Sequence, residues 1–218
     1  MRTKRSPTFA TAGLAVATIL AVAARILGEW FPGWAVLLLL TVVLGAGLTV
    51  LGQRELLRRR AQAWAASAGW TAVARDDRLW PWQGLQLHGE VRVERAWTRD
   101  VDGFAVTTGE IRWTGGALSG AVLPRHGKGA FVVVRLPRAV PDMAVRLPYR
   151  FVGDWPRQTE PEVRQAFLDG RIPPWTVREG ELFTIEPQDG LFLDPDVLDR
   201  AVRRALLAVR MLELDLLD

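Results

Sequence analysis

The sequence has no cysteine and only two histidines, His88 and His126. Without cysteine the chain has no disulfide, no thiolate nucleophile and no thiolate metal ligand, which is consistent with a reducing compartment. Neither histidine has a second histidine at metal-ligand spacing, so a zinc site would need distant carboxylates. We therefore expect no metal and no other cofactor.

Lysine and asparagine are also scarce: asparagine is absent, and 26 of the 28 basic residues are arginine. The net charge of +4 is unevenly distributed, because residues 1–60 hold 8 basic and 2 acidic side chains whereas residues 61–218 hold 20 and 22. A nucleic-acid-binding domain needs a positive patch on its folded part, and here the arginines alternate with acids. We expect no nucleic-acid partner.

Catalytic motifs are missing as well. The segment His126–Gly129 lacks the first glycine of a phosphate-binding loop and has Gly129 in place of the hydroxyl residue that would hold magnesium. Ser119 lacks the glycine two positions earlier that a nucleophile elbow carries. The neighbouring carboxylates of Asp76 and Asp77 are typical of a solvated turn. The remaining acidic group suits a helix start, where the helix dipole favours negative charge, and comprises Asp194, Asp196 and Asp199. The sequence predicts a protein that is not an enzyme.

What the chain does have is two long apolar runs near its start, Thr8–Leu27 and Trp34–Leu51. Each is close to the roughly 20 residues that a helix needs to cross a bilayer core. Only a short linker separates them, so residues 1–52 are predicted to form a transmembrane hairpin. An alternative for the first run is a cleaved signal peptide, since Ala21–Ala23 resembles a small-residue cleavage site.

Charges flanking the two runs predict their orientation. Basic residues precede the first run and follow the second, which places both ends of the hairpin, and the N- and C-termini, in the cytoplasm. The chain is thus expected in the plasma membrane, multi-pass, with membrane lipids as partners. Tryptophans between the runs suit the outer headgroup region. The predicted membrane-interface residues are Arg54, Arg58, Arg59, Arg60, Trp30 and Trp34.

Residues 53–69 are predicted to continue the second run as a juxtamembrane helix that ends at Gly69. Leu57, Ala61, Trp64 and Ala68 recur at helical spacing along it. This stripe is expected to dock on the domain that follows.

Residues 70–218 are predicted to form one cytoplasmic α+β domain, a mostly antiparallel β-sheet with a long C-terminal helix. Alternating patterns indicate strands, and Ala130–Leu136, apolar throughout its centre, is expected to be a central strand covered on both faces. Glu160–Leu168 is expected to be a surface helix. The other predicted strands are Trp70–Ala74, Glu90–Thr98, Phe104–Trp113, Met143–Leu147, Thr176–Arg178, Leu182–Ile185 and Leu191–Leu193.

The turn signal Asp100–Gly103 predicts a long hairpin between Glu90–Thr98 and Phe104–Trp113. We expect Trp97 and Trp113 to lie on the same face of it.

The C-terminal helix is predicted to begin at the N-cap Asp194, with Pro195 in its first turn, and to run to about Leu214. Apolar residues, among them Leu198, Val202, Val209 and Leu212, follow each other at heptad spacing. Two interpretations remain open. The seam packs on the sheet of its own domain, or it contacts a protein partner or a second copy of the chain.

The order of these parts, together with Gly69-Trp70, Leu136–Pro141, Val145 and Asp189–Leu193, resembles a group of uncharacterised membrane proteins from actinobacteria. The resemblance covers most of the chain. It implies the same membrane topology and supplies no catalytic or binding residues.

From these features we expect a membrane-anchored cytoplasmic interaction module that is not an enzyme. The alternative is a lipid- or small-ligand-sensing domain at the inner leaflet, because a curved antiparallel sheet capped by a C-terminal helix is also pleckstrin-homology-like.

Overall fold

The computed structural model describes residues 33–74, 78–83, 88–118, 120–138, 140–153, 160–188 and 194–212. By chain contacts it divides between Leu56 and Leu57 into two units. The predicted first span Thr8–Leu27, the residue Trp30 and the predicted strand Leu191–Leu193 lie outside the described residues.

Helix α2 (Gly33–Ser67) joins the second apolar run to the juxtamembrane segment without a break. Among the described residues it is the one helix long and apolar enough to cross a membrane. Its apolar part is exposed to solvent in the structure, with Trp34 at 70% and Leu48 at 68%. At about 1.5 Å per residue, Trp34–Leu51 extends over about 27 Å, close to the thickness of a bilayer core.

The end of α2 confirms the helix-terminating role of Gly69, whose φ is +74°. The Trp70 amide donates to the Ala65 carbonyl at 2.8 Å and the Gly69 amide to the Ala66 carbonyl at 3.3 Å, which is the Schellman pattern of helix termination. Ala61 and Ala65 are 2% exposed in the core of the following domain. The predicted docking of this part of the helix is therefore confirmed.

One antiparallel sheet of eight strands forms the centre of the domain, in the order β1-β2-β3-β4-β8-β7-β5-β6. This confirms the α+β class with a C-terminal helix. The strands are β1 (Thr71–Val73), β2 (Val91–Val101), β3 (Phe104–Trp113), β4 (Gly127–Arg135), β5 (Met143–Arg146), β6 (Arg150–Gly153), β7 (Trp175–Arg178) and β8 (Glu181–Pro187). Sequence patterns missed β6. Among the described strands β1 and β6 are the two ends of the order and do not pair, so the sheet is open.

The predicted central strand is confirmed as β4, between β3 and β8. Its side chains from Ala130 to Val134 are at most 1% exposed. They alternate between two apolar clusters, with Val132 and Val134 in one and Phe131 and Val133 in the other. Both faces of the sheet are thus covered.

The expectation that Trp97 and Trp113 share a face is wrong. Asp102 and Gly103, with φ of 54° and 83°, form a two-residue turn of the hairpin type. The resulting register pairs Trp97 with Thr108. Trp113 is five residues further along β3, so strand alternation turns it to the opposite face. The two rings accordingly lie in different clusters.

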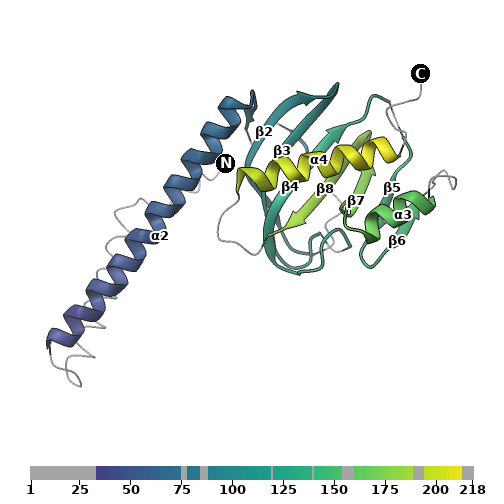
Figure 1. Cartoon of the computed structure of the whole chain (residues 1–218). Coiled ribbons are helices and arrows are strands. Elements are labelled where there is room, and N and C mark those ends of the chain that lie inside the picture. The colour runs from purple at the N-terminus through teal and green to yellow at the C-terminus, as the bar shows by residue number, and fades with distance from the viewer. Residues whose placement is uncertain are drawn as a thin grey trace, which may run out of the picture. The chain divides into compact units, whose positions relative to one another are not determined.

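Helix α4 (Pro195–Met211) lies across β3, β4 and β8, and the shorter helix α3 (Glu160–Leu168) packs beside it (Figure 1). Asp194 is the N-cap of α4, as predicted, and its side chain accepts from the Asp196 amide at 3.2 Å. The helix is held by its polar side as well. Trp64 of α2 donates to the Asp199 carboxylate at 3.2 Å, and Arg210 pairs with Asp102 at 2.6 Å.

Candidate ligand groove

The predicted membrane-interface residues that the structure describes all lie on α2. Trp34 is near the start of the exposed apolar stretch, and the arginines follow its end. The side chains of Arg59 and Arg60 are exposed. The arginines Arg54, Arg58, Arg59 and Arg60 therefore form a basic segment next to an apolar one on a single helix.

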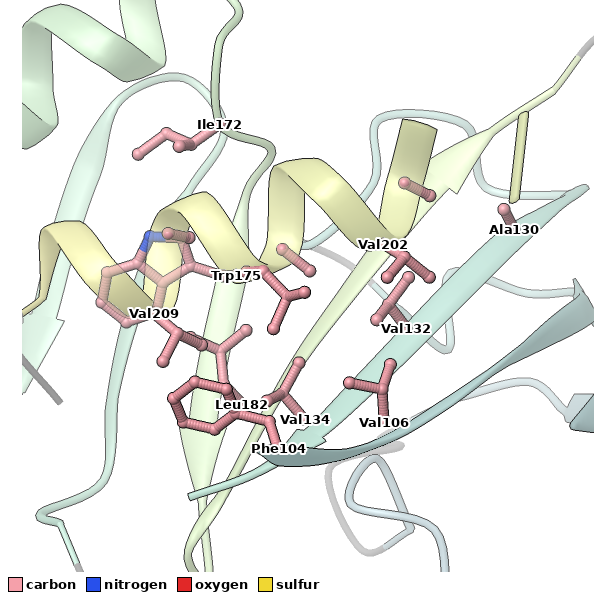
Figure 2. Packing of buried hydrophobic residues seen from close by; sticks show 14 of the residues in the cluster. Phe104, Val106, Ala130, Val132, Val134, Ile172, Trp175, Leu182, Val202 and Val209 are labelled. Atoms are coloured by element: carbon pink, nitrogen blue, oxygen red, sulfur yellow. The ribbon is translucent and has the colours of Figure 1, made fainter. Parts of the chain in front are cut away.

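The apolar seam of α4 is covered by the chain's own sheet. Leu198 and Val209 are 0% exposed, and Val202 and Leu212 are 5% exposed. Figure 2 shows Val202 and Val209 pointing from α4 into the cluster that contains Val132 and Val134 of β4. Of the two interpretations of the seam, packing within the domain is the one found, and these side chains have no free surface for a partner helix.

The histidines and the acids at the start of α4 have separate roles in the described part of the chain. His88 is exposed, while His126 accepts a hydrogen bond from the Gly115 amide at 3.3 Å through Nδ1. Asp194 caps a helix and Asp199 holds Trp64. Within the described ranges no group of three or more histidines and carboxylates is placed to hold a metal ion. Ser119, Asp76 and Asp77 lie outside those ranges.

A groove of about 780 Å³ opens instead on the face of the sheet opposite α4. Its floor is formed by the ends of β2, β3 and β4, and its walls by residues 78–81, by the segment after β4 and by the β7–β8 turn. The polar and charged lining residues are Arg78, Thr98, Thr107, Arg135, Arg138, Glu179 and Glu181.

One wall of the groove is a tightly held ion pair between Arg78 and Glu181. Nη2 of Arg78 lies 2.6 Å from both carboxylate oxygens of Glu181, and the two side chains are 26% and 21% exposed. Nη1 of Arg78 also donates to the Thr107 hydroxyl at 3.4 Å, and the guanidinium lies 5.0 Å from the centre of the Trp80 ring. These contacts hold the chain segment around Arg78 against the sheet.

Sheet register brings a second arginine to the same place. Arg135 of β4 pairs with Glu181 of β8 across the ladder, so their side chains share a face. Both oxygens of Glu181 are already bonded to Arg78. Within the described part of the chain, neither Arg135 nor Arg138 forms an ion pair, and both are exposed.

Glu179, the second acidic residue that lines the groove, is paired with an arginine that does not line it. Glu179, 76% exposed, pairs with Arg178 at 3.3 Å, and Arg178 also donates to the Gln83 carbonyl at 2.9 Å. Two of the lining charges thus cancel in the Arg78–Glu181 pair, and Glu179 is matched by Arg178. Arg135 and Arg138 remain, and no other described residue that lines the groove compensates their two positive charges.

Two arginines on the α4 side of the sheet, Arg95 and Arg204, differ because they are paired within the fold. Arg95 bonds Glu110 at 2.7 Å, and Arg204 of α4 bonds Glu186 at 2.7 Å and the Gly170 carbonyl at 2.9 Å. On the opposite face, Arg146 of β5 lies against Gly120, and its burial lowers its pKa from the ordinary value. The Arg204 contacts fasten α4 to the sheet and to the segment that follows α3.

Sequence patterns missed the groove. The β7–β8 turn and the bend after β4 were both predicted. Arg135 of β4 and Glu181 of β8, however, are 46 positions apart in the sequence, and periodicity does not show which distant strands pair. Arg78 belongs to a segment without regular structure. The signal that was available is the position of Arg135 and Glu181 at the ends of two apolar strands.

Comparisons of the chain with protein-family models, with curated proteins and with solved structures find no match. The resemblance noted from the sequence therefore stays a prediction.

Proposed function

We propose that the chain is a multi-pass plasma-membrane protein whose cytoplasmic domain is a non-enzymatic interaction module. The observation that carries this proposal is helix α2, in which an exposed apolar stretch continues into a part packed in the folded domain. An exposed apolar stretch of this length is unfavourable in water and is accommodated by a bilayer.

The topology is proposed from charge. The cluster from Arg54 to Arg60 follows the apolar stretch on α2, and three basic residues precede Thr8. Positive charge on both sides of a two-span hairpin favours cytoplasmic termini. The domain from Leu57 onward then lies in the cytoplasm.

Single-cysteine labelling tests this topology cleanly, because the natural chain has no cysteine. The variants are Ser6→Cys, Glu29→Cys and Arg203→Cys, each treated in intact cells with a membrane-impermeant maleimide. We expect labelling of the cysteine at position 29 alone, with the other two labelled only after the membrane is permeabilised. Labelling of Arg203→Cys in intact cells would overturn the cytoplasmic location.

The interaction role is tested by purifying the intact protein from its native membrane after cross-linking in cells and identifying proteins and lipids by mass spectrometry. A protein that cross-links reproducibly to one exposed face of the domain supports the module. A stoichiometric lipid or metabolite without a protein favours the second candidate function.

That second candidate is sensing of a lipid or small ligand, and the groove is the observation that favours it. Its volume of about 780 Å³ is within the range of small-molecule sites. The pleckstrin-homology-like form of this hypothesis expects a sheet curving towards a barrel, capped by the helix. In the described part of the chain α4 crosses the sheet face and the two end strands do not pair, so the groove supports sensing without that fold.

A further inference from the structure

We infer that the groove binds a small oxyanion with two negative charges, a phosphate monoester, between Arg135 and Arg138. This inference rests on the second candidate function. It gives that function a ligand class, which follows from the charges and hydrogen-bonding groups of the groove.

Charge compensation is the first step. Glu181 is paired with Arg78 at 2.6 Å, and Glu179 is paired with Arg178 at 3.3 Å. A ligand with two negative charges neutralises the two arginines that remain. The planar guanidinium fork matches phosphate and carboxylate oxygens, which is why arginine is common at such sites.

The second step concerns the shape of the site. This chain is rich in arginine, so an exposed arginine alone carries no argument. Arg200 and Arg203, for example, are exposed on α4. Arg135 and Arg138 differ from them because they line a concave space together with a fixed wall, the Arg78–Glu181 pair. A ligand placed there touches several chain segments at once.

The floor of the groove provides hydrogen-bond acceptors, whereas the arginines on its rim are donors. The Thr107 hydroxyl donates to the Thr98 hydroxyl at 3.3 Å, and Thr98 donates to the Val106 carbonyl at 3.1 Å. Both hydroxyl donors are used, and each oxygen already accepts one hydrogen bond, Thr107 from Arg78 and Thr98 from Thr107. One acceptor lone pair remains on each oxygen. Donors on the rim and acceptors on the floor suit an anionic group esterified to a molecule that carries hydroxyls.

A phosphate monoester reaches this groove from one of two sources, a soluble metabolite or a lipid headgroup. The test uses the full chain in nanodiscs of phosphatidylcholine, with amide hydrogen exchange as readout. Three probes are compared: sodium phosphate, glycerol 3-phosphate, and nanodiscs in which part of the lipid is phosphatidic acid. Sodium chloride at equal ionic strength is the baseline.

We expect slower exchange in the segments 133–138 and 179–182 with at least one phosphate probe. The variant Arg135→Gln/Arg138→Gln should weaken this binding by about tenfold or more. The matched control Arg200→Gln/Arg203→Gln removes the same charge from α4 and should leave it unchanged.

An effect of the soluble probes identifies a metabolite site, whereas an effect of phosphatidic acid alone identifies a headgroup site. The inference is overturned if no probe changes exchange in these segments, or if Arg135→Gln/Arg138→Gln responds as the natural chain does. Membrane flotation of the same samples reports anchoring separately, so loss of phosphate binding with normal flotation refutes the groove ligand and leaves the membrane-anchored module standing.

Discussion

Helix α4 covers one face of the sheet, whereas irregular segments carrying Trp80, Trp82, Leu118 and Val122 cover the other. On the helix side small residues allow close approach, and 4 of the 26 buried residues in the cluster are aromatic. On the other side 5 of 12 are aromatic, because wide rings replace the missing layer of secondary structure. The rings of Trp80 and Trp82 stack with their centres 5.2 Å apart, and Trp82 and Phe131 make a T-shaped contact with the same separation. The groove opens where this aromatic cover ends.

Of the two faces of the sheet, we expect the one covered by α4 to tolerate a new buried charge least. Val209→Asp places a carboxylate at a position that is 0% exposed, inside an apolar cluster. We expect a loss of about 4 kcal/mol or more in the free energy of unfolding, or no folded domain. Denaturant unfolding measures it. Arg203→Asp on the exposed side of the same helix should change stability by only about 0.5 kcal/mol, and an equal loss in both variants would contradict the burial of the seam.

The aromatic face should lose stability locally. Trp82 is 1% exposed, and its replacement by alanine should cost about 3 kcal/mol, at the lower end for such truncations because an irregular segment is freer to collapse than a helix. We expect hydrogen exchange to rise first in residues 78–83 and much less in α4. A uniform rise over both regions would show that the two faces open together.

Arg78→Gln tests the ion pair at the border between the aromatic cover and the groove. It leaves the Glu181 carboxylate without its 2.6 Å partner and should cost about 2 kcal/mol. The double variant Arg78→Gln/Glu181→Gln removes the unpaired charge as well and should recover part of that loss. A double-mutant cycle with no coupling energy would mean that the pair does not hold this segment.

Gly69→Ala gives the smallest expected effect, at the point where α2 enters the helix-covered core. A Cβ there meets only Cδ of Arg99 at 3.8 Å, so the cost comes from the φ of +74° and should be about 1 kcal/mol. Gly69→Asn should cost less, since asparagine tolerates this conformation better. If both variants unfold at the same denaturant concentration as the natural chain, the conformation of Gly69 does not limit stability.

Patterns within a segment were enough to predict much of the fold. The borders of β3, the bounds of α3, the start of α4 and the end of α2 follow from alternation, capping and glycine. Which residues meet across the sheet does not follow from such patterns. The reversal of Trp97 and Trp113 depends on the parity set by a two-residue turn, and the meeting of Arg78, Arg135 and Glu181 depends on pairing between strands distant in the chain. Those are properties of register and topology.

The two edges of the open sheet limit how readily crowded copies of the domain can associate. The end strands, β1 and β6, span only Thr71–Val73 and Arg150–Gly153, and the exposed Arg150 adds charge to the second. Short, charged edges offer few unpaired backbone groups to another chain, which discourages strand addition and aggregation. If the domain is held at a membrane, as proposed above, copies are confined to two dimensions, and such edges favour keeping neighbouring molecules separate even at high surface density.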